Sequence, residues 1–272
     1  VNASDWLGKR TPAPAPAPAK PIVLKADVFW GPEYFANVNA QMPTLKAIEK
    51  ESNGRITFDI YYAKALVPKK EAEECIAKGV ADLAHLGFQY KAGAYPREAI
   101  QELPYALPMR SKNPQGDSKI MMGLLDKYYY KDVDPGVKVL SVYGVSLNRV
   151  MTSKKGGKVS SMEDLKGLKL RSAGGFNNDI VTLLGATPVA VLPGDLPEAL
   201  AKGIVDGVFH SYASEWGWGG YKYLDYSTDL PINIFPLAWL INREKFESMP
   251  SDLAQIVSRN LEEGGPLIAK RY

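Results

Sequence analysis

The chain has 272 residues, of which 46% are hydrophobic and 10% aromatic, and its formal net charge is +3. This size and composition suit a globular protein with a buried core, built as one large domain or as two lobes. Lysine and arginine are scattered along the chain, which argues against a nucleic-acid or membrane-surface partner. No apolar stretch reaches the ~20 residues of a membrane-spanning helix. The single cysteine, Cys75, cannot form an internal disulfide.

The N-terminal segment differs in composition from the rest of the chain. Residues 11–20 are almost entirely alternating proline and alanine. Such a tract cannot build a core and favours an extended polyproline spacer. We therefore expect residues 1–21 to be a linker, serving either as a tether between an anchor and the folded body or as a terminal tail.

The following part of the chain alternates between strand and helix patterns. We expect strands at residues 22–30, 55–62, 80–86 and 137–147. We expect helices at residues 34–52, 68–79 and 114–130, with a loop rich in Tyr, Pro and Gly at 88–108. A β-α-β-α-β order favours parallel strands with helices packed on the faces of the sheet.

A helix start followed by a strand leads to Arg171. Ser161 and Asp164 have the spacing of a capping signature, and Gly167 ends that helical turn. Leu168 to Leu170 alternates as a strand, so Arg171 lies at its carboxyl end, where open α/β sheets bind ligands. A guanidinium at that edge fits a carboxylate with two parallel hydrogen bonds. A surface arginine paired with a nearby aspartate explains the same motif equally well.

The second half continues the alternation of helix and strand. We expect helices from Arg171 to a stop at Gly185, from a capping box at 195–198 to Gly203, and over 250–263. We expect strands at 187–192, at 204–209 and within 226–241. The loop at 210–221 carries Trp216 and Trp218, which line an apolar pocket or cap the core of their own lobe.

One segment of the chain resembles another. The segments from Glu74 to Asp82 and from Glu198 to Asp206 share Glu, Ala, Lys, Gly and Asp at equal spacing. Each segment reads as a helix, a glycine stop and a strand. Any βα unit can converge on this pattern, but together with the order of elements it favours two lobes of related build.

Several motifs together resemble a known family. They are Asp164-Leu-Lys-Gly-Leu-Lys-Leu-Arg171, Leu183-Leu-Gly-Ala-Thr-Pro188, Ala199-Leu-Ala-Lys-Gly-Ile-Val-Asp-Gly207, Glu102-Leu-Pro-Tyr105 and Phe246-Glu-Ser-Met-Pro250. In this order they resemble the extracytoplasmic solute-binding proteins of tripartite ATP-independent periplasmic (TRAP) transporters, DctP type. The resemblance covers the chain from about residue 22 to its end. Family chains usually continue with further helices, so a truncation at Tyr272 stays open.

The resemblance implies a type II-like periplasmic-binding-protein fold, in which two α/β lobes joined by crossing strands close over an organic acid. We expect lobe I to comprise residues 22–146 and 231–272, and lobe II residues 147–230. The resemblance assigns the carboxylate clamp to Arg171 and a second family arginine to Arg149. Phe209 and His210 replace the Glu-Asn pair that the family often has after Val-Asp-Gly.

We therefore predict a periplasmic or otherwise extracytoplasmic receptor, lipid-anchored or free. It would capture a small carboxylate, with the aromatic residues favouring a bulky or aromatic monocarboxylate, and deliver it to TRAP membrane subunits. No cofactor or metal is expected. The candidate ligand-binding residues are Arg171, Arg149, His210, Trp216, Trp218, Phe176, Phe88, Tyr34 and Phe209.

Two alternatives remain at this point. The first is the solute receptor of an ATP-driven (ABC) importer, which shares the two-lobe design. The second is a hydrolase using His210 and Ser211 with Asp206. The chain lacks a Gly-x-Ser-x-Gly elbow, and adjacent residues on a strand point to opposite faces, so we predict that it is not an enzyme. Two histidines and one cysteine argue against a transition-metal site, and His85 is expected in the core or at a strand end.

Overall fold

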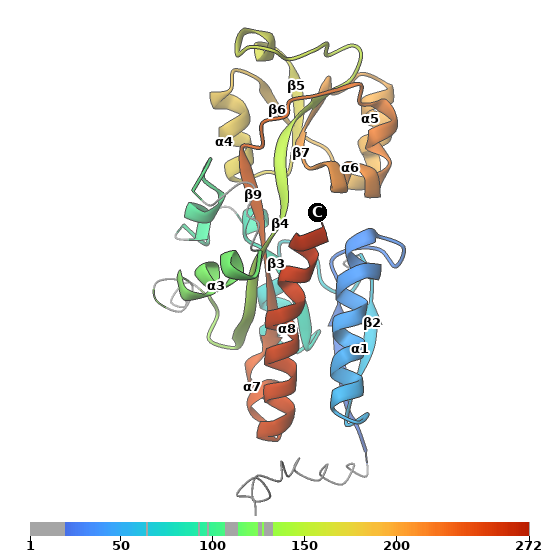
Figure 1. Cartoon of the computed structure of the whole chain (residues 1–272), viewed down its shortest axis with the longest axis vertical. Helices are drawn as coiled ribbons and strands as arrows, with labels where there is room; N and C mark the ends of the chain where they lie inside the picture. Colours follow the sequence, from blue (N-terminus) through green and yellow to red (C-terminus); the bar gives the residue numbers. More distant parts are fainter. Residues whose placement is uncertain are drawn as a thin grey trace, which may run out of the picture.

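The computed structural model describes residues 20–63, 65–91, 93–96, 98–106, 114–124, 127 and 133–271 (Figure 1). The linker predicted for residues 1–21 therefore lies outside the described residues except for its last two positions. The expected end of the helix near residue 130 and the chain end at Tyr272 also lie outside them. Within the described ranges, no helix combines the length and apolar character needed to cross a membrane.

The strands lie in the order β2-β1-β3-β9-β4-β7-β5-β6, and the short β8 pairs with β4. Their bounds are β1 Ile22–Asp27, β2 Ile56–Tyr61, β3 Leu83–Gly87, β4 Val137–Thr152, β5 Lys169–Ser172, β6 Thr187–Ala190, β7 Gly207–His210, β8 Tyr226–Ser227 and β9 Asn233–Asn242. The helices are α1 Met42–Glu51, α2 Ala72–Ala77, α3 Pro114–Leu124, α4 Phe176–Leu183, α5 Leu196–Ala201, α6 Tyr212–Trp218, α7 Arg243–Glu247 and α8 Ser251–Arg271.

Two lobes follow from this strand order, one above the other in Figure 1. In the lower lobe β1 runs parallel to β2 and β3, and β9 is antiparallel to β3. In the upper lobe β5 runs parallel to β6 and β7. The long strand β4 joins them, since it pairs with β9 up to Asn148 and with β7 from Arg149. The mixed α/β fold with crossing strands is confirmed, while the exact lobe boundaries stay a prediction.

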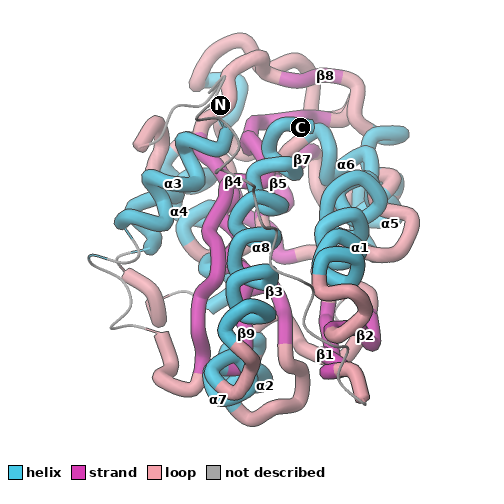
Figure 2. Tube along the Cα trace, turned by 60° about the horizontal axis from the view of Figure 1, so that its bottom comes forward, coloured by secondary structure: helices cyan, strands magenta, loops and turns pink. Residues whose placement is uncertain are grey.

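The lower lobe has a hydrophobic core on each face of its sheet. Helices α1 and α8 cover one face and α2 and α3 the other, as Figure 2 shows for α8. Strand β9 serves both cores by alternation, because Trp239 and Ile241 face α1 and α8 whereas Ala238 and Leu240 face α2. His85 is buried in β3, as expected.

The upper lobe repeats this arrangement on a smaller scale. Helix α4 packs on one face of its sheet with Leu170 and Phe209, and α5 packs on the other with Val208. Neighbouring residues of one strand thus serve opposite cores. The alternation also determines which side chains of β5 and β7 face α6 and the lower lobe instead of a core.

The self-similar segments found in the sequence fold in the same way. Gly79 and Gly203 both end a helix with positive φ, at 71° and 65°. Asp82 then accepts a hydrogen bond from the Lys25 backbone N–H at 2.8 Å, and Asp206 accepts one from the Lys169 backbone N–H at 3.0 Å. Each aspartate thereby ties its strand to the parallel neighbour.

The capping expectations are met in part. The Asp164 carboxylate accepts the backbone N–H of Ser161, as the expected signature requires, and also that of Ser160, and a single 3₁₀ turn follows. Asp195 precedes α5, which has a proline in its first turn, but Asp195 makes no side-chain cap hydrogen bond.

The segment with the two tryptophans is a helix, not the expected loop. Ser211 caps α6 by accepting the Ser214 backbone N–H, and Gly219 ends it in the left-handed region at φ 79°. Both are ordinary helix-boundary residues.

Strand β4 also extends five residues beyond the expected end at 147, because its last residues pair with β7 and β8.

Candidate functional site

Arg171 occupies the third position of the four-residue strand β5 and is only 2% exposed. Its Nε donates to the carbonyl oxygen of Val191 at 3.2 Å, which fixes the direction of the side chain. Its Nη1 is buried without a hydrogen-bond partner among the described residues, and no carboxylate there forms an ion pair with it. Burial lowers the pKa of the guanidinium, but an arginine stays charged in proteins. Among the described residues this buried guanidinium keeps one nitrogen without an acceptor, while the charge of Glu215, which forms no ion pair with it, opposes the lowering of its pKa.

Arg149 and His210 face each other across the antiparallel pair of β4 and β7. Directly paired residues project on the same side of a sheet, so both side chains lie on one face. The Arg149 guanidinium lies 4.1 Å from the ring centre of Tyr212, and its Nη1 is 3.9 Å from Asp229 Oδ1. The charge of Arg149 is thus partly balanced by Asp229, whereas no carboxylate in the described ranges lies within ion-pair distance of Arg171.

His210 contacts two residues of the helix α6. Its Nδ1 donates to Glu215 Oε1 at 2.7 Å, because a carboxylate can only accept. Its ring stacks on Trp218 with the ring centres 4.8 Å apart. Burial lowers the pKa of His210 against the opposing influence of Glu215. The Arg171 guanidinium lies 5.3 Å from the centre of the same Trp218 ring.

The lower lobe meets this group through aromatic side chains. The Tyr34 hydroxyl donates to the carbonyl oxygen of Ala213 in α6 at 3.1 Å, and the Tyr34 ring stacks on Trp30 at 5.2 Å. Gly217 packs so closely on the Tyr34 ring that a Cβ there would lie 1.8 Å from it. The two lobes are therefore in direct contact at α6.

A polar link joins the lobes next to α4. Asn233 Nδ2 in β9 donates to Asn177 Oδ1 at 2.9 Å and also to the carbonyl oxygen of Glu102 at 2.9 Å. The backbone of Gly175, just before α4, lies close to the carbonyl oxygen of Gln89. We call the region formed by these contacts and those of α6 the lobe junction.

Sequence reasoning missed three titratable residues at the lobe junction. Lys69 places its Nζ 4.9 Å from the ring centre of Phe29, 5.3 Å from that of Tyr90 and 5.9 Å from that of Trp218. Burial, aided by the positive charge of Arg171, lowers the pKa of Lys69 to about 8. Burial raises the pKa of Tyr90 to about 12 and that of Glu102 to about 8. No local motif marks these residues.

The structure does not gather all nine residues predicted from the sequence. Arg171, Arg149, His210, Trp218 and Tyr34 lie at or beside the lobe junction. Of the remaining four, Trp216 is 66% exposed and stacks on Tyr221, Phe209 lies in the upper-lobe core, and Phe88 lies in the lower-lobe core against Tyr95. Phe176 packs against the upper-lobe core, between the junction residues Gly175 and Asn177. The binding role of each residue stays a prediction.

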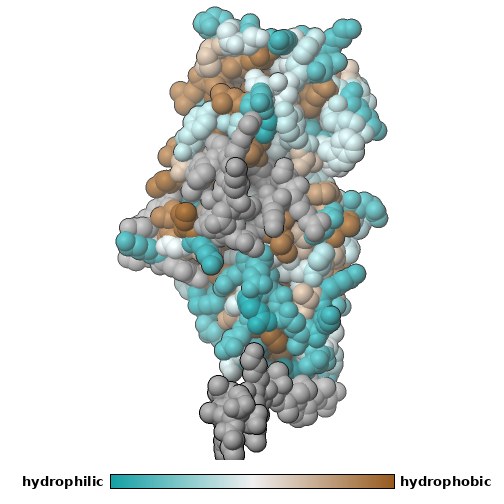
Figure 3. All heavy atoms as spheres, in the orientation of Figure 1, coloured by the Kyte–Doolittle hydropathy of each residue, from teal (hydrophilic) through white to brown (hydrophobic). Residues whose placement is uncertain are grey.

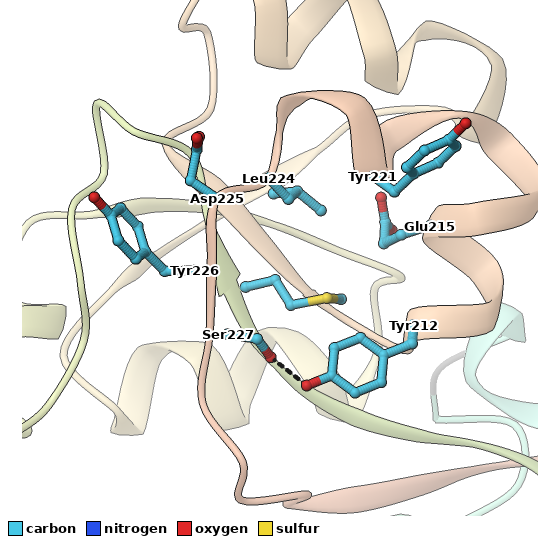
Figure 4. A pocket seen from close by; sticks show the side chains of 8 residues that line it. Tyr212, Glu215, Tyr221, Leu224, Asp225, Tyr226 and Ser227 are labelled. Carbon is cyan, nitrogen blue, oxygen red and sulfur yellow. Dashed lines mark hydrogen bonds between the residues drawn. The ribbon is translucent and has the colours of Figure 1, made fainter.

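A separate pocket of about 190 Å³ opens on the upper lobe (Figure 4). The Tyr212 hydroxyl and Ser227 Oγ, 2.8 Å apart, close one side of it. None of the nine predicted ligand residues lines this pocket. Its lining residues are Met151, Tyr212, Glu215, Tyr221, Leu224, Asp225, Tyr226 and Ser227.

The geometry does not assemble a hydrolase. Ser211 Oγ donates to Ser214 Oγ and caps α6 rather than bonding to His210. Asp206 is engaged by the Lys169 backbone N–H and by Lys155 Nζ at 3.0 Å. Within the described part of the chain, no group of His, Cys, Asp and Glu could hold a metal ion. The arrangement suits binding of an anion rather than chemistry on it.

Two α/β lobes joined by crossing strands, with the buried Arg171 where they meet, have the architecture of a solute-binding receptor. Residues 37–272 match the DctP family, bacterial extracellular solute-binding protein family 7, and the chain belongs to this family. Members of the family are transport receptors without enzymatic activity, so the hydrolase alternative is excluded. The chain is thus an extracytoplasmic solute-binding protein of the TRAP class, as predicted from its motifs.

Individual relatives agree with this assignment. A solute-binding protein of Chromohalobacter salexigens is 22% identical over 85% of this chain and 68% of its own length. A TRAP periplasmic solute-binding protein from Desulfovibrio salexigens has 26% identity and a TM-score of 0.77, covering 93% of this chain and 76% of its own. A marine metagenome TRAP solute-binding protein specific for aromatic acid ligands, in complex with 3-hydroxybenzoate, has 25% identity and a TM-score of 0.79, with coverage of 93% and 78%.

Proposed function

We propose that this protein captures a small organic acid by its carboxylate at Arg171 and delivers it to TRAP membrane subunits. The observation that carries the proposal is the buried Nη1 of Arg171, which has no partner among the described residues. A buried charge is costly unless it is paired and hydrogen-bonded. A ligand carboxylate supplies both the counterion and the missing acceptor.

The side chains around Arg171 favour an acid with a flat or bulky apolar body. Trp218 lies beside the guanidinium, and Tyr34 and Trp30 stack on the lower-lobe side of α6. Aromatic walls around one charged group are typical of sites for small ligands. The marine relative specific for aromatic acid ligands supports the same class. We therefore propose an aromatic or similarly bulky monocarboxylate.

A panel of acids tests this proposal by thermal shift and titration calorimetry. The panel includes benzoate, 3-hydroxybenzoate, phenylacetate, mandelate, glucuronate and succinate. An aromatic acid at 100 times its dissociation constant should add ~2.7 kcal/mol of stability. No stabilisation by any aromatic acid would contradict the proposed ligand class.

Substitution of Arg171 tests the clamp itself. Truncating one partner of a buried charge pair costs ~2–5 kcal/mol, so Arg171→Met should weaken binding roughly 30-fold to several thousand-fold. Arg259→Met is the control, since Arg259 lies exposed on α8 and pairs with Glu51. Equal affinity of Arg171→Met and the parent would refute the clamp.

The delivery step requires a docking surface for the membrane subunits. Hydrophobic side chains gather around α4 on the face shown in Figure 3, and Leu183 in α4 is 83% exposed. An apolar side chain so exposed is available to a partner. Uptake of a labelled acid into vesicles containing the membrane subunits should depend on this protein and fall when Leu183 is changed to Asp, while acid binding in solution persists. Unchanged uptake by the Leu183→Asp variant would exclude α4 from docking.

A further inference from the structure

We infer that Lys69 is a second ligand-binding cation, contributed by the lower lobe, and that the acid's carboxylate bridges Lys69 and Arg171 across the lobe junction. This inference rests on the proposed function, because it concerns the same anionic group. It adds a residue from the opposite lobe and explains how one ligand holds both lobes together.

The positions of the two cations support a shared anion. Arg171 in β5 and Lys69 before α2 both lie within 6 Å of the centre of the Trp218 ring. Like charges this close repel each other in a low-dielectric site, and the charge of Arg171 is one cause of the lowered pKa of Lys69. Neither side chain forms an ion pair among the described residues. A carboxylate between them would attract both cations and so offset their mutual repulsion.

Three aromatic rings surround the ammonium of the half-buried Lys69. Phe29, Tyr90 and Trp218 present rings within cation–π distance. Rings stabilise a cation but offer no acceptor for its N–H groups. The other titratable groups facing this region are Tyr34, Tyr90, Glu102, His210, Arg171 and Glu215. Of these, Glu102 has its pKa raised to about 8 by burial, so near neutral pH it does not supply a full negative charge.

Unpartnered polar groups in the lower lobe also support a ligand on that side. Gln89 Oε1 and both amide atoms of Gln101 are buried without hydrogen-bond partners among the described residues. Gln89 lies two residues after β3, in the 3₁₀ turn Phe88–Lys91, and its carbonyl oxygen approaches Gly175 of the upper lobe. Polar groups buried in this way are normally satisfied by protein, water or ligand. Gln89 thus places a polar residue of the lower lobe at the junction, in addition to the aromatic ones.

The test compares Lys69→Met, Lys69→Arg and the control Lys70→Met, whose side chain is exposed beside Lys69. The probe is whichever acid of the panel stabilises the parent most. At pH 7, Lys69→Met should bind it roughly 10- to 150-fold more weakly, while Lys70→Met binds as the parent does. Lys69→Arg should retain most of the affinity. The melting temperature of each variant is also measured without ligand, so that folding defects can be told apart from binding defects.

A pH series separates a binding role from a packing role. Between pH 7 and 9.5 the parent should lose more affinity than Lys69→Arg, because the lysine loses its proton in this range and arginine does not. Glu102 ionises in both proteins and does not create the difference. Parallel pH profiles, or unchanged affinity in Lys69→Met, would overturn the inference.

The outcomes also separate this inference from the proposed function. If Arg171→Met loses binding and Lys69→Met does not, the clamp stands and the bridge is wrong. If Arg171→Met binds as the parent does, both are wrong. If no acid of the panel binds the parent protein, both proposals fall together.

Discussion

Gly217 offers a direct test of whether the lobes must meet at α6 for ligand to be held. An added Cβ at Gly217 would lie 1.8, 2.4 and 2.8 Å from the Cε2, Cδ2 and Cζ atoms of Tyr34. Carbon atoms in contact are normally ~3.5–4.0 Å apart. The ring cannot move aside freely, because it stacks on Trp30 and its hydroxyl is bonded to Ala213. Relief therefore requires the upper and lower lobes to move apart.

The expected cost can be bounded from the geometry. Overpacking by one methyl group in a fixed setting costs ~1–3 kcal/mol, and this cost falls only on the arrangement in which the lobes touch. The affinity of Gly217→Ala for the best acid should then fall roughly 5- to 150-fold. The stability of Gly217→Ala without ligand should fall by less than its binding free energy, because alanine is favoured over glycine in a helix by ~0.5–1 kcal/mol. Its melting temperature without ligand measures this.

Calorimetry and small-angle scattering provide the assay. Gly123→Ala is the matched control, since Gly123 is also helical and a Cβ there would meet no atom within 4 Å. We expect Gly217→Ala to show a larger radius of gyration with ligand than the control. In a Tyr34→Ala background the Gly217→Ala change should have no further effect. A Gly217→Ala protein with the affinity and scattering profile of the control would refute the reasoning.

Two further predictions concern stability. Asp82→Ala and Asp206→Ala should each lower the free energy of unfolding in urea by ~1–3 kcal/mol, because each leaves a backbone N–H without its acceptor. A loss no larger than that of the exposed control Asp59→Ala would contradict the view that these aspartates tie neighbouring strands together. Glu102 is predicted to make stability fall as pH rises. Its pKa is about 8 in the fold and ~4.3 in the unfolded chain, so between these values the native state binds more protons than the unfolded state. Glu102→Gln should remove this decline. In urea unfolding, the free energy of unfolding of the variant should exceed that of the parent at pH 8, and the difference should shrink towards pH 5. Parallel pH curves for the two proteins would show that Glu102 is already ionised.

The position of Arg171 near the carboxyl end of a strand could be predicted from the sequence, because it depends on local signals. A glycine stop followed by an alternating Leu-Lys-Leu places the next residue at the carboxyl end of a strand, whatever packs around it. The repeated Gly and Asp positions were equally local, and the structure shows the same turn twice. Features that depend on a short stretch of backbone could therefore be predicted.

The partners from the other lobe could not be predicted in this way. Lys69, Tyr90 and Glu102 reach the lobe junction only because distant segments pack together. Trp216 and Trp218 were expected to act together in a loop, but in a helix residues two apart lie on different sides. Trp218 consequently faces His210, while Trp216 faces Tyr221 near the surface. Ser211 and Gly219 carried the signal for that helix.

Strand β4 has a consequence for how the protein can be divided. Its sixteen residues, Val137–Thr152, belong to one continuous ribbon that begins beside β9 and ends beside β7. The upper half is also inserted within the chain of the lower half, which resumes at β9. A fragment holding only one half would expose a row of unsatisfied backbone groups along the severed edge. The two halves are therefore not exchangeable modules, and chimaeras should keep β4 and β9 from the same parent.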